Sequence, residues 1–147
     1  MSKVVSLLHI VINTKFRHPT IEESNKRILY SFIYGVLKRH RCFLYRMNGI
    51  SNHIHMLIDL HQSIALSDLM LEIKRESSRW MKQSGLFPRF DGWGREYAAF
   101  SCSYREKDGV IEYIKSQEVH HQVTPFEDEL HKLYDETGQE WNEYALT

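Results

Sequence analysis

The sequence has only two cysteines, Cys42 and Cys102, and neither belongs to a CxxC pair. Two isolated thiols exclude a disulfide-stapled scaffold and a zinc site built from cysteine pairs, so we expect a chain of the reducing cytoplasm. No apolar run approaches the roughly 20 residues of a bilayer-spanning helix, and no membrane segment is expected. The first apolar stretch alternates like a strand and lacks a small-residue cleavage site, so we do not interpret it as a signal peptide.

Charge of one sign is also lacking, because 19 Lys and Arg residues balance 19 Asp and Glu residues. The two signs are nevertheless separated along the chain. Residues 123–147 hold seven acids and one base, which leaves residues 1–122 with a surplus of six positive charges. The basic portion is compatible with a polyanionic partner, although Lys and Arg also coat ordinary solvated surfaces.

Hydrophobic periodicity predicts four strands and four helices along the 147 residues. Their order is β-α-β-β-α-β followed by two helices, which is the ferredoxin-like split βαβ arrangement of the α+β class. Such a fold has an antiparallel sheet with two helices on one face, and we expect the other face to be open to a partner. The predicted strands are 6–15, 42–50, 53–60 and 97–103, and the predicted helices are 21–40, 67–84, 110–121 and 124–138.

Turn and cap residues support these boundaries. Thr20 has the spacing of a capping box with the acid three residues later, and Ser67 is a plausible N-cap for the second helix. Asn48-Gly49 is expected to form the turn of the hairpin between the two middle strands. Gly85 is expected to end the second helix, and Thr124 to cap the last one.

The segment "ISNHIHMLID" carries two histidines, His53 and His55, at strand spacing. Successive side chains of a strand alternate between its faces, so both imidazoles point the same way. The two histidines are either ligands of one metal ion or two polar residues on a solvated sheet face. Histidine donors suit zinc, manganese and iron alike, so the pair alone does not select a metal.

Tyr113 and Gln117 stand one i, i+4 step apart and therefore on one face of the third helix. A deprotonated tyrosine is a competent nucleophile for phosphoryl groups, although its free pKa is about 10. A glutamine carbonyl oxygen can ligate Mg²⁺ or Mn²⁺. The alternative is that Tyr113 simply fills a core position of an amphipathic helix.

"HIHML" followed about 60 residues later by "YIKSQ" resembles the HUH single-tyrosine transposases of the "IS two hundred" group, with their repeat-associated (REP) relatives. "HIVINTKFR" is similar to the opening strand of that family, "LMLEIKRESSRWM" to its second helix and "AAFSCSYREKDGVIEYIKSQEVHH" to the stretch that leads into its tyrosine helix. One departure is Ala98, where many relatives carry glycine.

The resemblance implies a single transposase domain over 1–147, with a ferredoxin-like core (1–104), a tyrosine helix (105–122) and an acidic helical tail (123–147). It implies that Tyr113 is the nucleophile and that His53, His55 and Gln117 hold Mg²⁺ or Mn²⁺. It further implies a homodimer, with active sites shared between subunits in many members, that moves an insertion sequence through a 5′-phosphotyrosine intermediate.

Single-stranded DNA with hairpin ends is the partner that the resemblance implies. Four basic residues of the second helix are candidate phosphate contacts, or else part of a solvated helix face: Lys74, Arg75, Arg79 and Lys82. Other functions stay open, namely a domesticated enzyme that nicks repeat palindromes, a metal nuclease that uses water, and a non-catalytic module that binds single strands. The last usually needs paired aromatics on its central strands, where this chain has histidines.

Overall fold

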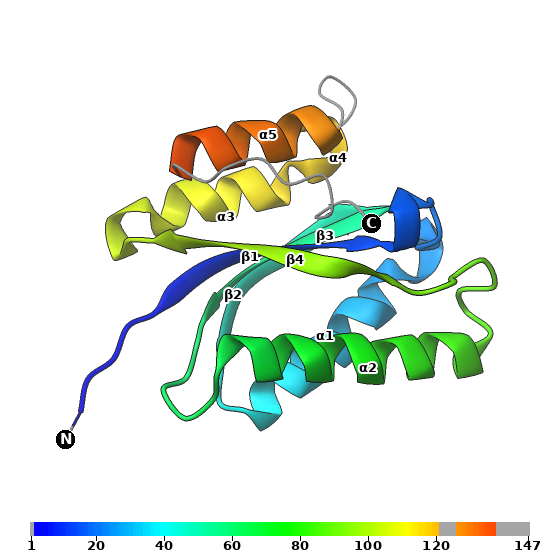
Figure 1. Cartoon of the computed structure of the whole chain (residues 1–147), viewed down its shortest axis with the longest axis horizontal. Helices are drawn as coiled ribbons and strands as arrows, with labels where there is room; N and C mark the ends of the chain where they lie inside the picture. Colours follow the sequence, from blue (N-terminus) through cyan, green and yellow to red (C-terminus); the bar gives the residue numbers. More distant parts are fainter. Residues whose placement is uncertain (1, 121–125, 138–147) are drawn as a thin grey trace.

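In the computed structural model of the chain, residues 2–120 and 126–137 are described. They form a four-stranded sheet between two layers of helices (Figure 1). None of the helices in these ranges is long and apolar enough to cross a bilayer. The main elements are β1 (Leu7–Thr14), α1 (Lys26–Arg39), β2 (Phe43–Ile50), β3 (His53–Asp59), α2 (Leu66–Ser84), β4 (Trp93–Cys102), α3 (Lys107–Lys115), α4 (Gln117–His120) and α5 (Phe126–Thr137).

The sheet is antiparallel throughout, with the strand order β2-β3-β1-β4. This order and the helices between the strands confirm the predicted split βαβ fold. Helices α1 and α2 cover one face of the sheet (Figure 1), and the alternate side chains of β1 and β3 on that face form the main core with them. Its fully buried members include Ile10, Ile12, Ile54, Met56, Ile58, Leu29, Ile33, Leu69 and Ile73.

The opposite face of the sheet is covered as well, so the expectation of an open face is wrong. There, α3 and α5 form a layer over the sheet, on the side opposite α1 and α2 (Figure 1). The reason is hydrophobic: this face carries apolar side chains between its histidines, and leaving them in water is unfavourable. Leu130 and Leu133 of α5 pack on Val11, Ala98 and Phe100, and α3 packs through Ile114 on Leu7 and Leu57.

The hairpin between β2 and β3 does not turn at Asn48-Gly49, contrary to the prediction. Both residues lie inside β2, where they pair with His55 and Ile54, and the turn is formed by residues 51–52. Gly49 is used for close approach instead. A Cβ atom on Gly49 would lie 2.1 Å from the backbone oxygen of His53.

The helix boundaries differ from the predicted ones in two places. A short 3-10 turn over Glu23–Asn25 precedes α1, which begins at Lys26 without a side-chain cap, so the predicted capping box at Thr20 is not formed. Similarly, Ala65 rather than Ser67 occupies the N-cap position of α2. The end of α2 is as predicted, because Gly85 adopts φ 75°, the left-handed conformation that favours glycine.

The predicted third helix is divided at Ser116 into α3 and α4. Asn48 Nδ2 donates to the backbone oxygens of Ile114 and Lys115, at 3.1 and 3.2 Å. Because these oxygens bind a side chain of β2, they are engaged outside the helix at the point where α3 ends. The predicted N-cap Thr124 lies outside the described residues, and α5 begins at Phe126.

Candidate active site

His53 and His55 lie side by side on β3 and point toward the layer of α3 and α5. Both side chains are 0% exposed. The Nδ1 atom of His53 is 2.8 Å from Oδ1 of Asn52. Since an amide oxygen accepts hydrogen bonds, the ring proton of His53 sits on Nδ1, and the lone pair of Nε2 points into the site.

Gln117 lies next to His53, although it starts a new helix. Its Nε2 donates to the backbone oxygen of Tyr113 at 3.3 Å, which turns its Oε1 toward the sheet. That oxygen lies 3.1 Å from Nε2 of His53. A carbonyl oxygen and an imidazole lone pair that face each other are both electron-rich, and a cation between them would satisfy both.

A polar clamp holds the junction of α3 and α4 against the rest of the chain. Asn48 Nδ2, besides its bonds to α3, donates to Glu118 Oε2 at 3.1 Å, and Lys26 Nζ donates to Glu118 Oε1 at 2.7 Å. Burial lowers the pKa of Lys26, but its hydrogen bonds to Glu118 and Glu23 outweigh this and raise it overall. The lysine is therefore charged at neutral pH, and it fixes the segment that carries Tyr113 and Gln117.

Tyr113 stands directly over the histidines. Its ring makes edge contacts with His9 and His55, with centroid distances of 5.9 and 5.7 Å. Burial raises the pKa of the Tyr113 phenol far above its ordinary value, and the charge of Glu129 and a hydrogen bond to that carboxylate raise it further, while a hydrogen bond with Gln117 lowers it. In this arrangement the phenol is neutral at physiological pH and donates a hydrogen bond to Glu129.

Glu129 of α5 is a site residue that the sequence reasoning missed. It is 2% exposed, and its Oε1 lies 2.8 Å from Nε2 of His55 and 3.7 Å from Nε2 of His53. These three side chains form a group that could hold a metal ion. The available signal was its position: at helical spacing Glu129 shares the face of Leu130 and Leu133, so an acid interrupts an apolar stripe.

His9 of β1 is the second missed residue. Its Nε2 lies 2.7 Å from Nδ1 of His55, on the side of that ring away from Glu129. Burial, aided by the nearby His55, lowers the pKa of His9 to about 3, so His9 is neutral. A neutral His9 can accept the Nδ1 proton of His55 and thereby present Nε2 of His55 to a metal ion. Strand alternation groups His9 with Val11 and Asn13 on one face of β1, and only the pairing of β1 with β3 makes this the face of the two histidines.

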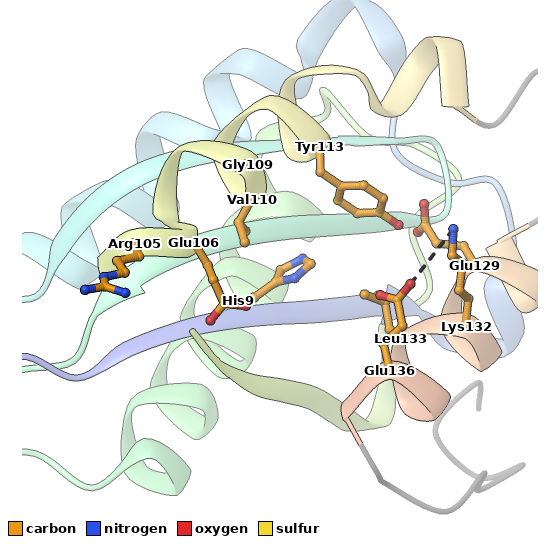
Figure 2. A pocket seen from close by; sticks show the side chains of 10 residues that line it. All are labelled: His9, Arg105, Glu106, Gly109, Val110, Tyr113, Glu129, Lys132, Leu133 and Glu136. Carbon is orange, nitrogen blue, oxygen red and sulfur yellow. Dashed lines mark ion pairs between the residues drawn. The ribbon is translucent and has the colours of Figure 1, made fainter. Parts of the chain in front are cut away.

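A pocket of about 470 Å³ opens beside Tyr113, between α3 and α5 (Figure 2). Figure 2 shows the phenol of Tyr113 and the carboxylate of Glu129 pointing toward each other at one end of it. Two bases, Arg105 and Lys132, contribute to the walls, and Lys132 pairs with Glu136 at 3.9 Å. The side chain of Tyr113 is therefore reached through a cavity of mixed charge.

The four basic residues predicted to contact DNA are not brought to this pocket. All four belong to α2, which lies on the other side of the sheet (Figure 1). Lys74 Nζ donates to the backbone oxygens of Gly94 and Glu96, each at 3.0 Å, and burial lowers the pKa of Lys74 to about 8. The other three side chains are exposed: Arg75, Arg79 and Lys82. Their contact with DNA stays a prediction.

Comparison with known proteins gives a family and a fold. The chain is similar over 80% of its length to a protein from Deinococcus radiodurans R1 described as a candidate transposase, with 95% of that chain covered, 19% identity and a TM-score of 0.60. It is similar over 82% of its length to a REP-associated tyrosine transposase bound to a REP hairpin, with 74% of that chain covered, 16% identity and a TM-score of 0.62. These two likenesses show the fold. No curated protein is significantly similar in sequence.

The family model "Transposase IS200 like" matches residues 3–117, which include both histidines, Tyr113 and Gln117. The match covers more than half of the chain and ends before α5. The chain therefore belongs to the family of IS200-like transposases.

Proposed function

We propose that this transposase cuts and rejoins single-stranded DNA by transesterification at Tyr113. One observation carries the proposal: the half-buried ring of Tyr113 lies against His55, in one site with the buried His53 and the amide oxygen of Gln117. A nucleophile for phosphorus next to a set of neutral metal ligands is what a metal-assisted phosphodiester exchange requires.

His53, His55 and Gln117 would hold Mg²⁺ or Mn²⁺. When bound, the ion would polarise the scissile phosphate and stabilise the charge that develops on it. The oxygen of Tyr113 bonds to phosphorus while the bond from phosphorus to the 3′ oxygen breaks, and the proton that the phenol loses is balanced by the one that the 3′ oxygen gains. The products are a 5′-phosphotyrosine and a strand that ends in a 3′-OH. Because one ester replaces another, a free 3′-OH can reverse the step and join new ends without ATP.

The proposed substrate is DNA with hairpin ends, in the cytoplasm. The similar REP-associated protein, which is bound to a REP hairpin, supports this choice. One tyrosine makes one covalent link, whereas moving an insertion sequence involves two ends, so we propose a homodimer. Its sites could be shared between subunits: a mixture of Tyr113→Phe and His53→Ala chains would then regain activity that neither variant has alone.

The test is covalent trapping on hairpin-bearing single-stranded DNA with Mg²⁺ or Mn²⁺. The wild-type chain should give a DNA–protein adduct that resists denaturation, and Tyr113→Phe should give none. Tyr34→Phe is a matched control, because Tyr34 is an exposed tyrosine of α1 in the other helix layer. Cleavage by Tyr113→Phe without an adduct would instead indicate water as the nucleophile. DNA binding without cleavage by the wild type would indicate a non-catalytic module.

A nicking enzyme that processes repeat palindromes without moving its own element would use the same site chemistry. The two alternatives differ in the DNA beside the gene. A rejoining assay with two different hairpin ends tests whether the strands are exchanged or only cut.

A further inference from the structure

We propose that Glu129 is a fourth protein ligand of the ion, so that metal binding fastens α5 over the active site. The inference rests on the metal site of the proposed function, in which His53, His55 and Gln117 hold one ion. It adds a ligand that lies outside the family match, which ends at residue 117. It also assigns a role to the acidic C-terminal segment, whose charge otherwise opposes the binding of DNA.

The donor spacing supports a single shared ion. Neighbouring ligands of an octahedral Mg²⁺ ion with bonds of about 2.1 Å stand about 3.0 Å apart. Oε1 of Glu129 lies 2.8 Å from Nε2 of His55 and 3.7 Å from Nε2 of His53, which in turn lies 3.1 Å from Oε1 of Gln117. Four protein ligands leave about two positions of the octahedron for a phosphate oxygen and the phenol or water.

The chemistry of the carboxylate points the same way. His53, His55 and Gln117 are neutral when they bind a metal, whereas hard divalent cations prefer anionic oxygen ligands. Glu129 supplies that charge, and its own burial is costly unless a cation faces it. The apolar contacts of Leu130 with Val11 and Phe100 hold α5 at the depth where the carboxylate reaches the histidines.

Ion binding and the docking of α5 must then be linked. If Glu129 increases the affinity for the ion by some factor when α5 is docked, the bound ion favours the docked state of α5 by the same factor. Because α5 forms one wall of the pocket beside Tyr113, the ion also sets how readily a DNA strand reaches the phenol (Figure 2).

The experiment measures this linkage in the full chain with Mn²⁺ alone. Calorimetric titration compares the wild type with Glu129→Gln, which keeps the shape of the side chain. Asp128→Asn is the control, because it removes the same charge from an exposed neighbour on α5. We expect Glu129→Gln to bind Mn²⁺ about tenfold or more weakly and Asp128→Asn to bind as the wild type does.

Hydrogen exchange gives a second readout, and its comparison of the wild type with and without Mn²⁺ does not depend on how a variant folds. Saturating Mn²⁺ should slow amide exchange in 126–137 by the same factor as the affinity change, and Glu129→Gln should abolish the slowing. Unchanged or tighter Mn²⁺ binding by Glu129→Gln would overturn the inference, as would exchange in α5 that ignores bound Mn²⁺. If His53→Ala binds Mn²⁺ as tightly as the wild type does, the metal site of the proposed function is refuted as well.

Discussion

Gly49 provides a sharp test of how the histidine strand is positioned. A Cβ atom at this position would lie 2.1 Å from the backbone oxygen of His53 and 2.8 Å from Cα of Ile54. Both contacts are to backbone, and real Cβ atoms essentially never come within 3.0 Å. In Gly49→Ala, β2 and β3 must therefore separate locally by about 1 Å.

The cost follows from that displacement. Forced packing of this kind costs about 1–3 kcal/mol, and each weakened ladder hydrogen bond costs about 0.5–1.5 kcal/mol. We expect Gly49→Ala to lose about 2–4 kcal/mol of unfolding free energy. At this chain length that lowers the Tm by about 5–15 °C. Since His53 moves with the strand, the affinity for Mn²⁺ should fall as well.

Gly35→Ala is the matched control for thermal unfolding followed by circular dichroism. Gly35 lies inside α1, and a Cβ atom there would meet nothing within 4 Å. Alanine is the better helix former, so this variant should gain about 0.5–1 kcal/mol. A Gly49→Ala variant with the Tm and Mn²⁺ affinity of the wild type would refute the reasoning.

Three further predictions concern the surroundings of the site. Glu118→Gln should cost about 1–2 kcal/mol at pH 7, because it takes one carboxylate from the buried amine of Lys26. Burial raises the pKa of Glu118, but hydrogen bonds with Lys26 and Asn48 lower it overall. The stabilisation by the Glu118 carboxylate is therefore present above pH 4.5, its usual pKa, and is lost as the pH falls below that value. Unfolding free energies of the wild type and Glu118→Gln at pH 7 and pH 3.5 should differ at the higher pH and converge at the lower one. His9→Ala should keep the fold and weaken Mn²⁺ binding about 10–100-fold by titration calorimetry, and unchanged affinity would contradict its role in orienting His55. Leu130→Ala should weaken the docking of α5 by about 2–4 kcal/mol, seen as faster amide exchange in 126–137 but not in β1.

Local signals in the sequence were enough to predict the order of the secondary-structure elements and part of the candidate site. Alternation and helical periodicity act over a few residues, so they predicted the order of strands and helices and the shared face of His53 and His55. The i, i+4 spacing likewise brought Tyr113 and Gln117 together, although the helix breaks between them. The resemblance to the transposase family, carried by those same residues, is confirmed. The division of the chain at 104 and 122 stays a prediction.

Only the tertiary structure decided which distant residues meet. The contact of Glu129 with His55 spans 74 positions, and that of His9 with His55 spans 46, so no local pattern records either. The same holds for Gly49, whose neighbour Asn48 suggests a turn, while the pairing with β3 makes it a point of close approach. The sheet face that local periodicity left open is closed by α3 and α5, because burying its apolar side chains outweighs leaving its histidines in water.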